Sequence, residues 1–343
     1  MKIFKKLAAA FLTAAVLSAH FTAPVLEVAA EAKPVYLALG DSITTGYRLS
    51  GGHFKEEGYV NILAQKNGYQ LHNCAVDGNT AGEILKQLKS KSLQNWVKKA
   101  KLITITCGGN DMVNALLDEA VAAYNTLNSE KPLKRSELLK IYKNQKDERY
   151  KPLLLATGFI LSDFQKSDRF KETLSEFKSA LSDIIKTLKE LNPDSVIFVA
   201  TQYNPYAHFS GEYKTLLSEP AAECIKLLNQ CIKSGAGEGN YTAVDVYTAF
   251  LNNESLLLNA SENPIQLDFH PSREGHEIIA ACFQKAIDSA SFPDDKLEKA
   301  SADFQKSSEE NKAVYRGLIA GAAIAVAVIF LRAIKAAKAA NRG

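Results

Sequence analysis

The chain has 343 residues, of which 46% are hydrophobic and 23% are charged, an ordinary composition for a globular protein. The formal net charge of +3 is too small for a nucleic-acid-binding surface, and no basic stripe is interleaved with aromatic residues. The five cysteines form no C-x-x-C pair, which argues against a thiolate zinc site and favours buried free thiols. We therefore expect neither a nucleic-acid partner nor a metal ion.

Residues 1–32 have the pattern of a secretory signal peptide. Three lysines near the start precede an apolar run over residues 7–17, and Ala30-Glu31-Ala32 offers small residues to a signal peptidase. The alternative is an uncleaved N-terminal anchor, but the short apolar run and the small residues favour cleavage. We expect the rest of the chain to be exported.

Residues 33–290 alternate between short apolar runs and helical patterns. The apolar runs predict strands at 35–39, 70–76, 101–106, 195–201 and 242–246. Helical periodicity lies between or after them, at 57–66, 80–91, 170–191 and 272–289. This alternation predicts a parallel sheet with helices on both faces, and in such sheets function gathers at the carboxyl ends of the strands.

Residues 112–168 do not fit the minimal alternation and read as a large helical insertion after the third strand. The insertion leaves from the strand end that carries polar motifs, so we expect it to form a cap or one wall of a pocket. Its apolar stretch 153–161 is equally consistent with a lipid-like substrate and with ordinary core packing.

Four candidate site residues lie beside the predicted strand ends or before the last helix. Ser42 follows the first strand, Gly78 the second and Asn110 the third, while His270 precedes the final helix. A serine nucleophile needs a general base, for which histidine is the usual side chain at neutral pH, and hydrogen-bond donors for the oxyanion. Each residue alone also fits a plain cap, turn or surface role. Their coincidence at one edge of the sheet predicts a single site.

The segment 35–47, with Gly40-Asp41-Ser42 at its centre, resembles the first sequence block of the SGNH/GDSL hydrolases. Gly78 and the segments 108–111 and 268–271 are similar to the later blocks, in the same order. The resemblance covers residues 33–290 and implies a flavodoxin-like three-layer α/β/α sandwich with a five-stranded parallel sheet. It implies no cofactor.

The same resemblance implies roles for the candidate residues. Ser42 would be the nucleophile and His270 the base, and the oxyanion would be held by the Ser42 N–H, the Gly78 N–H and the Asn110 side chain. The family usually carries an aspartate three residues before the histidine, whereas Asp268 lies two before it. Either Asp268 or a backbone carbonyl would orient His270.

The C-terminal segment predicts a membrane anchor. Residues 291–312 are polar and read as a stalk, and 313–334 would form a helix about 33 Å long, enough for a hydrocarbon core of about 30 Å. The basic residues of the tail 335–343 favour the cytoplasmic side. Together with the signal peptide, this predicts a single-pass membrane protein with its hydrolase domain outside the cell.

These features predict a secreted, membrane-anchored serine hydrolase that cleaves carboxylic esters, with lipase or acylhydrolase character, through an acyl-enzyme on Ser42. The alternative enzyme is an O-acetyl esterase on cell-envelope polysaccharide, whose sugar rings would stack on aromatic side chains, namely Tyr47, Tyr203, Tyr206 and Phe269. A binding module on an inactive hydrolase scaffold is a third possibility, and the presence of every motif residue counts against it.

Overall fold

The computed structural model describes residues 33–48, 52–144, 146–207, 209–251 and 270–292. Almost all of them belong to the unit that begins at Val35. The predicted signal peptide, transmembrane helix and basic tail lie outside the described residues. In the part of the chain that is described, no helix is both long and apolar enough to cross a membrane.

Five strands form one parallel sheet in the order β2-β1-β3-β4-β5. The strands are β1 (Val35–Leu39), β2 (Gln70–Asn73), β3 (Ala100–Ile105), β4 (Val196–Ala200) and β5 (Thr242–Val244). All five lie where the apolar runs predict them, and the parallel α/β sandwich is confirmed. β2 ends three residues earlier than predicted, yet the Cys74 and Val76 amides still donate to the Ala38 and Gly40 carbonyls at 2.8 and 3.1 Å. These bonds join the loop after β2 to the loop after β1.

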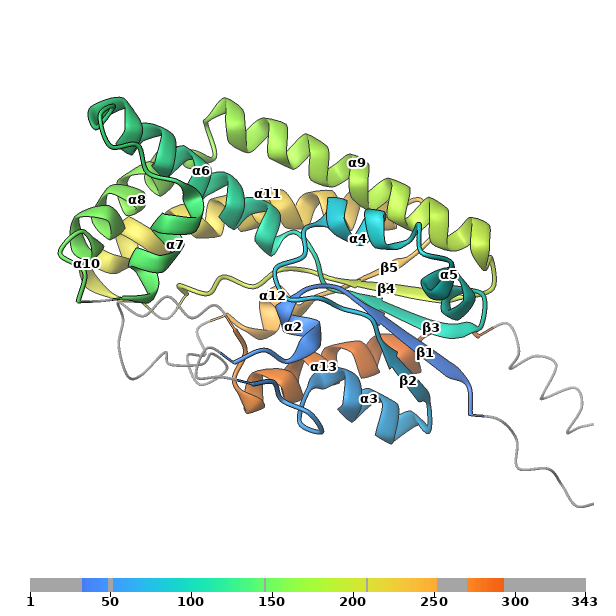
Figure 1. Cartoon of the computed structure of the whole chain (residues 1–343). Helices are drawn as coiled ribbons and strands as arrows, with labels where there is room; N and C mark the ends of the chain where they lie inside the picture. Colours follow the sequence, from blue (N-terminus) through green and yellow to red (C-terminus); the bar gives the residue numbers. More distant parts are fainter. Residues whose placement is uncertain (1–32, 49–51, 145, 208, 252–269, 293–343) are drawn as a thin grey trace, which may run out of the picture. The chain divides into compact units, whose positions relative to one another are not determined.

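Helices cover both faces of the sheet (Figure 1). On one face lie α4 (Ala81–Gln87), α5 (Lys91–Val97), α6 (Gly109–Leu127), α9 (Asp168–Leu191) and α11 (Glu219–Ala236). On the other lie α3 (Tyr59–Asn67) and α13 (Arg273–Asp288). The shorter elements are α2 (Ser42–Thr45), α10 (Gly211–Tyr213), the π-helical turn η2 (Lys214–Ser218) and α12 (Val246–Ala249).

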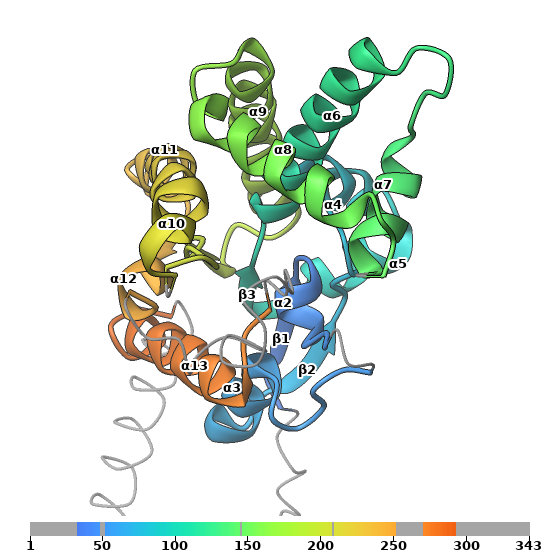
Figure 2. The same ribbon diagram turned by 90° about the vertical axis from the view of Figure 1, so that its left-hand side faces the viewer.

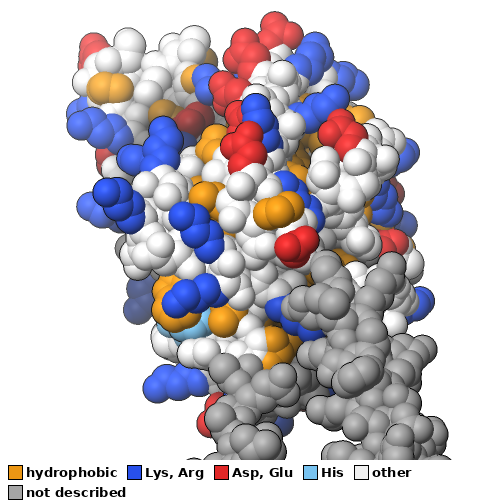
Figure 3. Space-filling model, turned by 90° about the vertical axis from the view of Figure 1, so that its right-hand side faces the viewer, with side chains coloured by type: hydrophobic (Ala, Val, Ile, Leu, Met, Phe, Trp, Pro, Cys, Tyr) orange, Lys and Arg blue, Asp and Glu red, His pale blue; other side chains and the backbone are white. Residues whose placement is uncertain are grey.

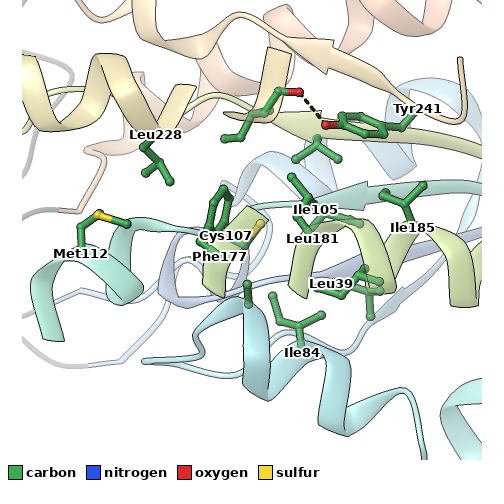
Figure 4. Close-up of a cluster of buried hydrophobic side chains, with 14 of the residues drawn as sticks. Leu39, Ile84, Ile105, Cys107, Met112, Phe177, Leu181, Ile185, Leu228 and Tyr241 are labelled. Carbon is green, nitrogen blue, oxygen red and sulfur yellow. Dashed lines mark hydrogen bonds between the residues drawn. The ribbon is translucent and has the colours of Figure 1, made fainter. Parts of the chain in front are cut away.

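The strands divide their side chains between two cores because successive residues of a strand point to opposite faces. Leu37 and Leu39 of β1 join the core under α4, α6, α9 and α11, whereas Tyr36 and Ala38 join the core under α3 and α13. Figure 4 shows the first of these cores, with Leu39 and Ile105 from the sheet packed close to Phe177 and Leu181 of α9.

α9 illustrates how the sequence pattern builds this core. Ser167 caps its start by accepting the Phe170 amide hydrogen bond at 3.1 Å. Its buried side chains recur three or four residues apart, which places them on one face: Phe177, Leu181, Ile184, Ile185 and Leu188. Burying each such side chain contributes about 1.5–3 kcal/mol, so this face holds the 24-residue helix on the sheet.

The insertion predicted after β3 is helical and carries a small core of its own. It consists of the outer part of α6 together with α7 (Arg135–Lys143) and α8 (Tyr150–Phe164). Leu138, Ile141, Tyr150 and Leu153 are buried among these helices. The predicted helix at 80–91 is instead two helices, because Ser90 starts a new one at α5.

The body extends slightly beyond its predicted end. Phe292, assigned from the sequence to the stalk, is 6% exposed and packs into the core beneath α13. The remainder of the predicted stalk lies outside the described residues. All five cysteines are free. Cys107 and Cys224 are buried as expected, whereas Cys74, Cys231 and Cys282 are only half-buried.

Candidate active site

The candidate site lies at the carboxyl ends of the strands. Figure 2 looks onto this edge and shows α2 near the centre, with the helices of the insertion above it and α13 below. β1 leads into α2, β3 into α6, and β4 into the loop before α10. The topology therefore brings loops that are distant in sequence to one place, as the parallel sheet predicts.

Ser42 is the first residue of α2, and the turn before it is tightly built. Gly40 has a φ of +146°, and a Cβ there would lie 2.4 Å from Thr106 Oγ1, so only glycine fits this position. Asp41 caps α2 by accepting a hydrogen bond from the Ile43 amide at 3.0 Å. The cap and the glycine fix where Ser42 stands.

A buried polar network supports this turn from below. Thr106 Oγ1 donates to Asp41 Oδ1 at 2.8 Å and lies 2.7 Å from Thr44 Oγ1, which in turn lies 2.7 Å from the Tyr59 hydroxyl. Thr106 follows β3 directly. Its supporting role could not be predicted from the sequence, because a lone threonine after a strand carries no distinctive signal. The network ties the loop that bears Ser42 to the neighbouring strand and to α3.

His270 stands beside Ser42, as predicted. Its Nε2 lies 2.9 Å from Ser42 Oγ, within hydrogen-bond distance. The imidazole precedes α13, whose N-cap Ser272 accepts the Gly275 amide hydrogen bond at 3.1 Å. The Tyr47 ring lies against the imidazole, with ring centroids 4.8 Å apart. Asp268, the predicted third member, lies outside the described residues.

The predicted oxyanion donors differ in their surroundings. Asn110 lies in the first turn of α6 and lines the same pocket as Ser42 and His270. One of its side-chain N–H groups donates to the Asn79 carbonyl at 3.0 Å. Gly78, which has a φ of +82° and an exposed backbone, precedes Asn79 and is not among the residues that line the pocket. Asn110 thus joins α6 directly to the loop that carries Gly78.

Asp111 strengthens this connection, a role that the sequence did not reveal. Its carboxylate accepts the Ala81 amide hydrogen bond, with Oδ2 at 3.1 Å and Oδ1 at 3.3 Å. Asn110 and Asp111 therefore hold both sides of the turn between Gly78 and α4. From sequence alone, Asp111 fits an ordinary turn residue equally well, because its partner is 30 residues away.

Burial raises the pKa of two carboxyl groups at the site. Desolvation raises the pKa of Asp41 to about 6, opposed by its hydrogen bonds from Thr106 and Ile43. Desolvation also raises the pKa of Asp111 to about 6, opposed by the Ala81 amide. Both groups are mainly ionised at neutral pH and become neutral in mildly acidic solution.

A largely apolar pocket begins at Ser42 and His270. Its empty volume is about 980 Å³, open solvent at the mouth included. α6 contributes Met112 and Leu116, and α8 contributes Leu161. The insertion thus forms a wall of the pocket, as its point of departure from the sheet predicts.

The opposite side of the pocket comes from α11 and the loop after β4. Cys224, Ile225 and Leu228 of α11 line it. Gln202, also at the pocket, donates from Nε2 to the Cys107 carbonyl at 2.9 Å, and Asn229 holds its backbone through bonds of 2.7 and 2.8 Å. The sequence pointed to this loop through Tyr203 and Tyr206, but it did not reveal the roles of Gln202 and Asn229.

The aromatic side chains expected to stack on sugars are engaged within the protein. Tyr203 is 6% exposed and stacks on Phe250 at a centroid distance of 4.4 Å. Tyr206 stacks on Phe209 at 5.8 Å. Both tyrosines line the apolar pocket. Phe269 lies outside the described residues.

Comparison with known proteins identifies the family of the chain. Residues 38–278 match the model of the GDSL-like Lipase/Acylhydrolase family. The chain is 24% identical over 266 residues to the Uncharacterized protein YpmR of Bacillus subtilis, covering 76% of this chain and 83% of that protein. It is 24% identical over 255 residues to the spore germination lipase LipC of Bacillus licheniformis, covering 71% of this chain and 92% of LipC.

Among solved structures, the chain is similar to the lipase Lip_vut3 from a goat rumen metagenome, with 24% identity, 73% of this chain and 96% of that chain covered, and a TM-score of 0.48. The family match spans well over half of the chain and includes Ser42, Gly78, Asn110 and His270. The chain therefore belongs to the GDSL-like lipase/acylhydrolase family of ester hydrolases.

Proposed function

We propose that the protein hydrolyses carboxylic esters of extended acyl chains through a covalent acyl-enzyme on Ser42. The observation that carries this proposal is the 2.9 Å approach of His270 Nε2 to Ser42 Oγ at an apolar pocket. His270 Nε2 takes the Ser42 proton as Oγ attacks the ester carbonyl, and then passes this proton to the leaving alkoxide. Water, activated by the same imidazole, then cleaves the acyl-enzyme and releases the carboxylic acid.

The negative charge of the tetrahedral intermediate would fall to the Ser42 N–H and the Asn110 amide, which lie at the pocket. The Gly78 N–H would be the third donor; Gly78 itself does not line the pocket, but the loop that carries it is bonded to Asn110. The Ser42 N–H belongs to the first turn of α2, where backbone N–H groups lack helical acceptors. Asn110 uses one of its two side-chain N–H groups for the Asn79 carbonyl, and this bond holds the amide in place beside the pocket. In this scheme Asp41 and Thr106 fix the position of Ser42 without taking part in proton transfer.

We propose that Asp268 orients His270 by accepting a hydrogen bond from its Nδ1–H. The spacing of two residues, where the family pattern has three, makes this carboxylate a weaker partner than in a full triad. Asp268→Ala should therefore lower kcat less than His270→Ala. Equal, large losses in the two variants would mean that a complete triad operates.

The lining of the pocket supports an acyl chain over an acetyl group. Apolar side chains from α6, α8 and α11 continue from Ser42 into the insertion, whereas an acetyl group needs only the space next to the nucleophile. Tyr203 stacks on Phe250 and is 6% exposed, so it offers little aromatic surface to a sugar. These features favour a lipase-like or acylhydrolase-like substrate over O-acetylated polysaccharide.

A chain-length series of p-nitrophenyl esters, from acetate to palmitate, tests this substrate class. Ile225→Trp would fill the pocket from α11, and Leu227→Trp is a matched control on the same helix that does not line it. Each methylene that the indole displaces should cost about 0.8 kcal/mol, or about fourfold in kcat/KM. We expect only Ile225→Trp to shift the optimum to shorter chains. An acetate optimum in the wild type would support an O-acetyl esterase instead.

For its location, we propose that the hydrolase domain acts outside the cell and is held at the membrane by residues 313–334. The support is the sequence pattern at the two ends: a signal peptide over 1–32 and an apolar segment followed by a basic tail. Fractionation of cells that express the full chain, followed by protease treatment of intact cells, tests this. Digestion of the domain from outside is expected, and its full protection would contradict the proposed topology.

A further inference from the structure

α8 carries apolar residues on two opposite faces. One face is buried, and its Leu161 lines the pocket beside α6. The other face exposes Leu155 and Phe159, with exposed fractions of 49% and 68%. Residues four apart on a helix are neighbours, so these two side chains form one exposed apolar patch. A helix that lines the pocket from within therefore also presents apolar side chains to the outside.

A basic segment leads into the helix that carries this patch. Residues 131–151 contain eight Lys or Arg but only three Asp or Glu. The two arginines of this segment are paired, Arg135 with Asp118 and Arg149 with acidic residues of the segment itself. Its described lysines make no ion pair with the described acidic residues, and they are exposed: Lys131, Lys134, Lys140, Lys143, Lys146 and Lys151. The segment therefore has a positive charge that its own contacts leave uncompensated.

α7, which carries Lys140 and Lys143, packs on α8 through specific contacts. The Tyr142 hydroxyl donates to the Leu153 carbonyl at 3.1 Å, and the Tyr142 and Tyr150 rings meet edge to face. In Figure 2, α7 and α8 lie next to each other at the carboxyl edge of the sheet, on the same side of the molecule as α2. α7, α8 and the loops that build the pocket thus share one end of the domain.

We propose that α8, with the lysines of α7, docks the enzyme on an anionic phospholipid surface. Leu155 and Phe159 would enter the boundary between headgroups and acyl chains, while the lysines face the lipid phosphates. This inference rests on the proposed function, since docking would bring the acyl pocket to the layer that contains its substrates. The opposite end of the domain differs, because its visible apolar side chains form small separate spots among charges of both signs (Figure 3).

A tryptophan at position 159 reports whether the patch itself enters the lipid, independently of other contacts between the full-length chain and the vesicle. The chain has one tryptophan, Trp96, which stacks on His72 and gives the background signal. In the full-length Phe159→Trp variant, vesicles of brominated phosphatidylcholine with phosphatidylglycerol should quench the new fluorescence. Leu127→Trp is the matched control, because Leu127 is 86% exposed at the end of α6 and lies outside the patch. We expect little quenching there.

The lipid dependence tests the role of the lysines. Leaving out phosphatidylglycerol should reduce the quenching at position 159, because the docking equilibrium of α8 should weaken by about fivefold for each lysine that faces the lipid. High salt should have a similar effect. No quenching at position 159, or equal quenching at positions 127 and 159, would overturn the proposal. Quenching that is indifferent to phosphatidylglycerol and salt would overturn its electrostatic part.

Kinetics separate docking from catalysis. The double variant Leu155→Asp/Phe159→Asp should lose at least tenfold in the hydrolysis of a long-chain ester dispersed in anionic vesicles, yet keep the wild-type kcat/KM on soluble p-nitrophenyl acetate. Equal activity of this variant and the wild type on vesicles would refute docking through α8. If the proposed function itself were wrong, the result would be different. The wild type would then show no Ser42-dependent hydrolysis of either substrate.

Discussion

Removing the Asp111 carboxylate should impair catalysis although it makes no contact with Ser42. Asp111→Ala would leave the buried Ala81 amide without its acceptor and free the turn that carries Gly78. A displacement of about 1 Å of an oxyanion donor can cost about 10²-fold, so we expect kcat to fall by about 10- to 100-fold with little change in KM. Asp111→Asn retains an oxygen that can accept the Ala81 hydrogen bond and should recover most of the activity.

The raised pKa of Asp111 also predicts how Asp111→Asn changes the stability of the protein with pH. Burial raises the pKa of Asp111 from its ordinary value to about 6, so between about pH 4 and pH 6 the folded state binds more protons than the unfolded state. This carboxyl group therefore lowers wild-type stability as pH rises through that window, by up to about 3 kcal/mol. Asp111→Asn removes the effect, so its unfolding free energy relative to the wild type should improve from pH 4 to pH 7.

Urea unfolding at a series of pH values, with steady-state kinetics on p-nitrophenyl butyrate, measures both signatures. An Asp111→Ala enzyme within twofold of the wild-type kcat would refute the positioning role. An Asp111→Asn enzyme as impaired as Asp111→Ala would show that the charge, and not the hydrogen bond, matters. A pH-independent stability difference between Asp111→Asn and the wild type would contradict the raised pKa.

Three further predictions concern the oxyanion hole, the turn before Ser42 and acid stability. Asn110→Ala should lower kcat by about 10²–10³-fold, and a loss below threefold in ester hydrolysis assays would remove Asn110 from the oxyanion role. Thr106→Val removes the charge-assisted hydrogen bond to Asp41 and should cost about 1.5–3 kcal/mol in urea unfolding; an unchanged midpoint would show that the network adds no stability. His276 is a buried residue of α13, and burial lowers its pKa to about 4. As pH falls from about 6.5 to 4, the unfolded state takes up a proton before the folded state does, so the free energy of unfolding drops by up to about 3 kcal/mol. His276→Phe should remove this acid sensitivity, and unfolding curves that keep it would contradict the assignment.

The sequence predicted the sheet well because its strands are short apolar runs bounded by glycine and polar residues. The strand that begins at Val35 lies within its predicted bounds, and Ser42 and His270 meet as expected. These successes depend on local patterns and on the rule that carboxyl ends of parallel strands share one edge. The two ends of the chain, Asp268 and the location of the protein stay predictions.

What the sequence did not reveal are the contacts that join distant segments. Thr106 and Asp41 are 65 residues apart, and nothing in either local pattern indicates that they bond. The pocket has the same origin, because Leu161 and Ile225 read as ordinary helix residues until α8 and α11 are placed across from each other. The break between α4 and α5 was missed because both halves have the same helical periodicity.

The most direct test of the proposed mechanism is to trap the acyl-enzyme. The full-length protein and its Ser42→Ala variant would be mixed with p-nitrophenyl decanoate, stopped with acid and digested, and the peptides analysed by mass spectrometry. The mechanism predicts a decanoyl mass on the peptide that contains Ser42, and the loss of both this adduct and ester hydrolysis in Ser42→Ala. An acyl group on another residue, or undiminished hydrolysis by the folded Ser42→Ala variant, would contradict it.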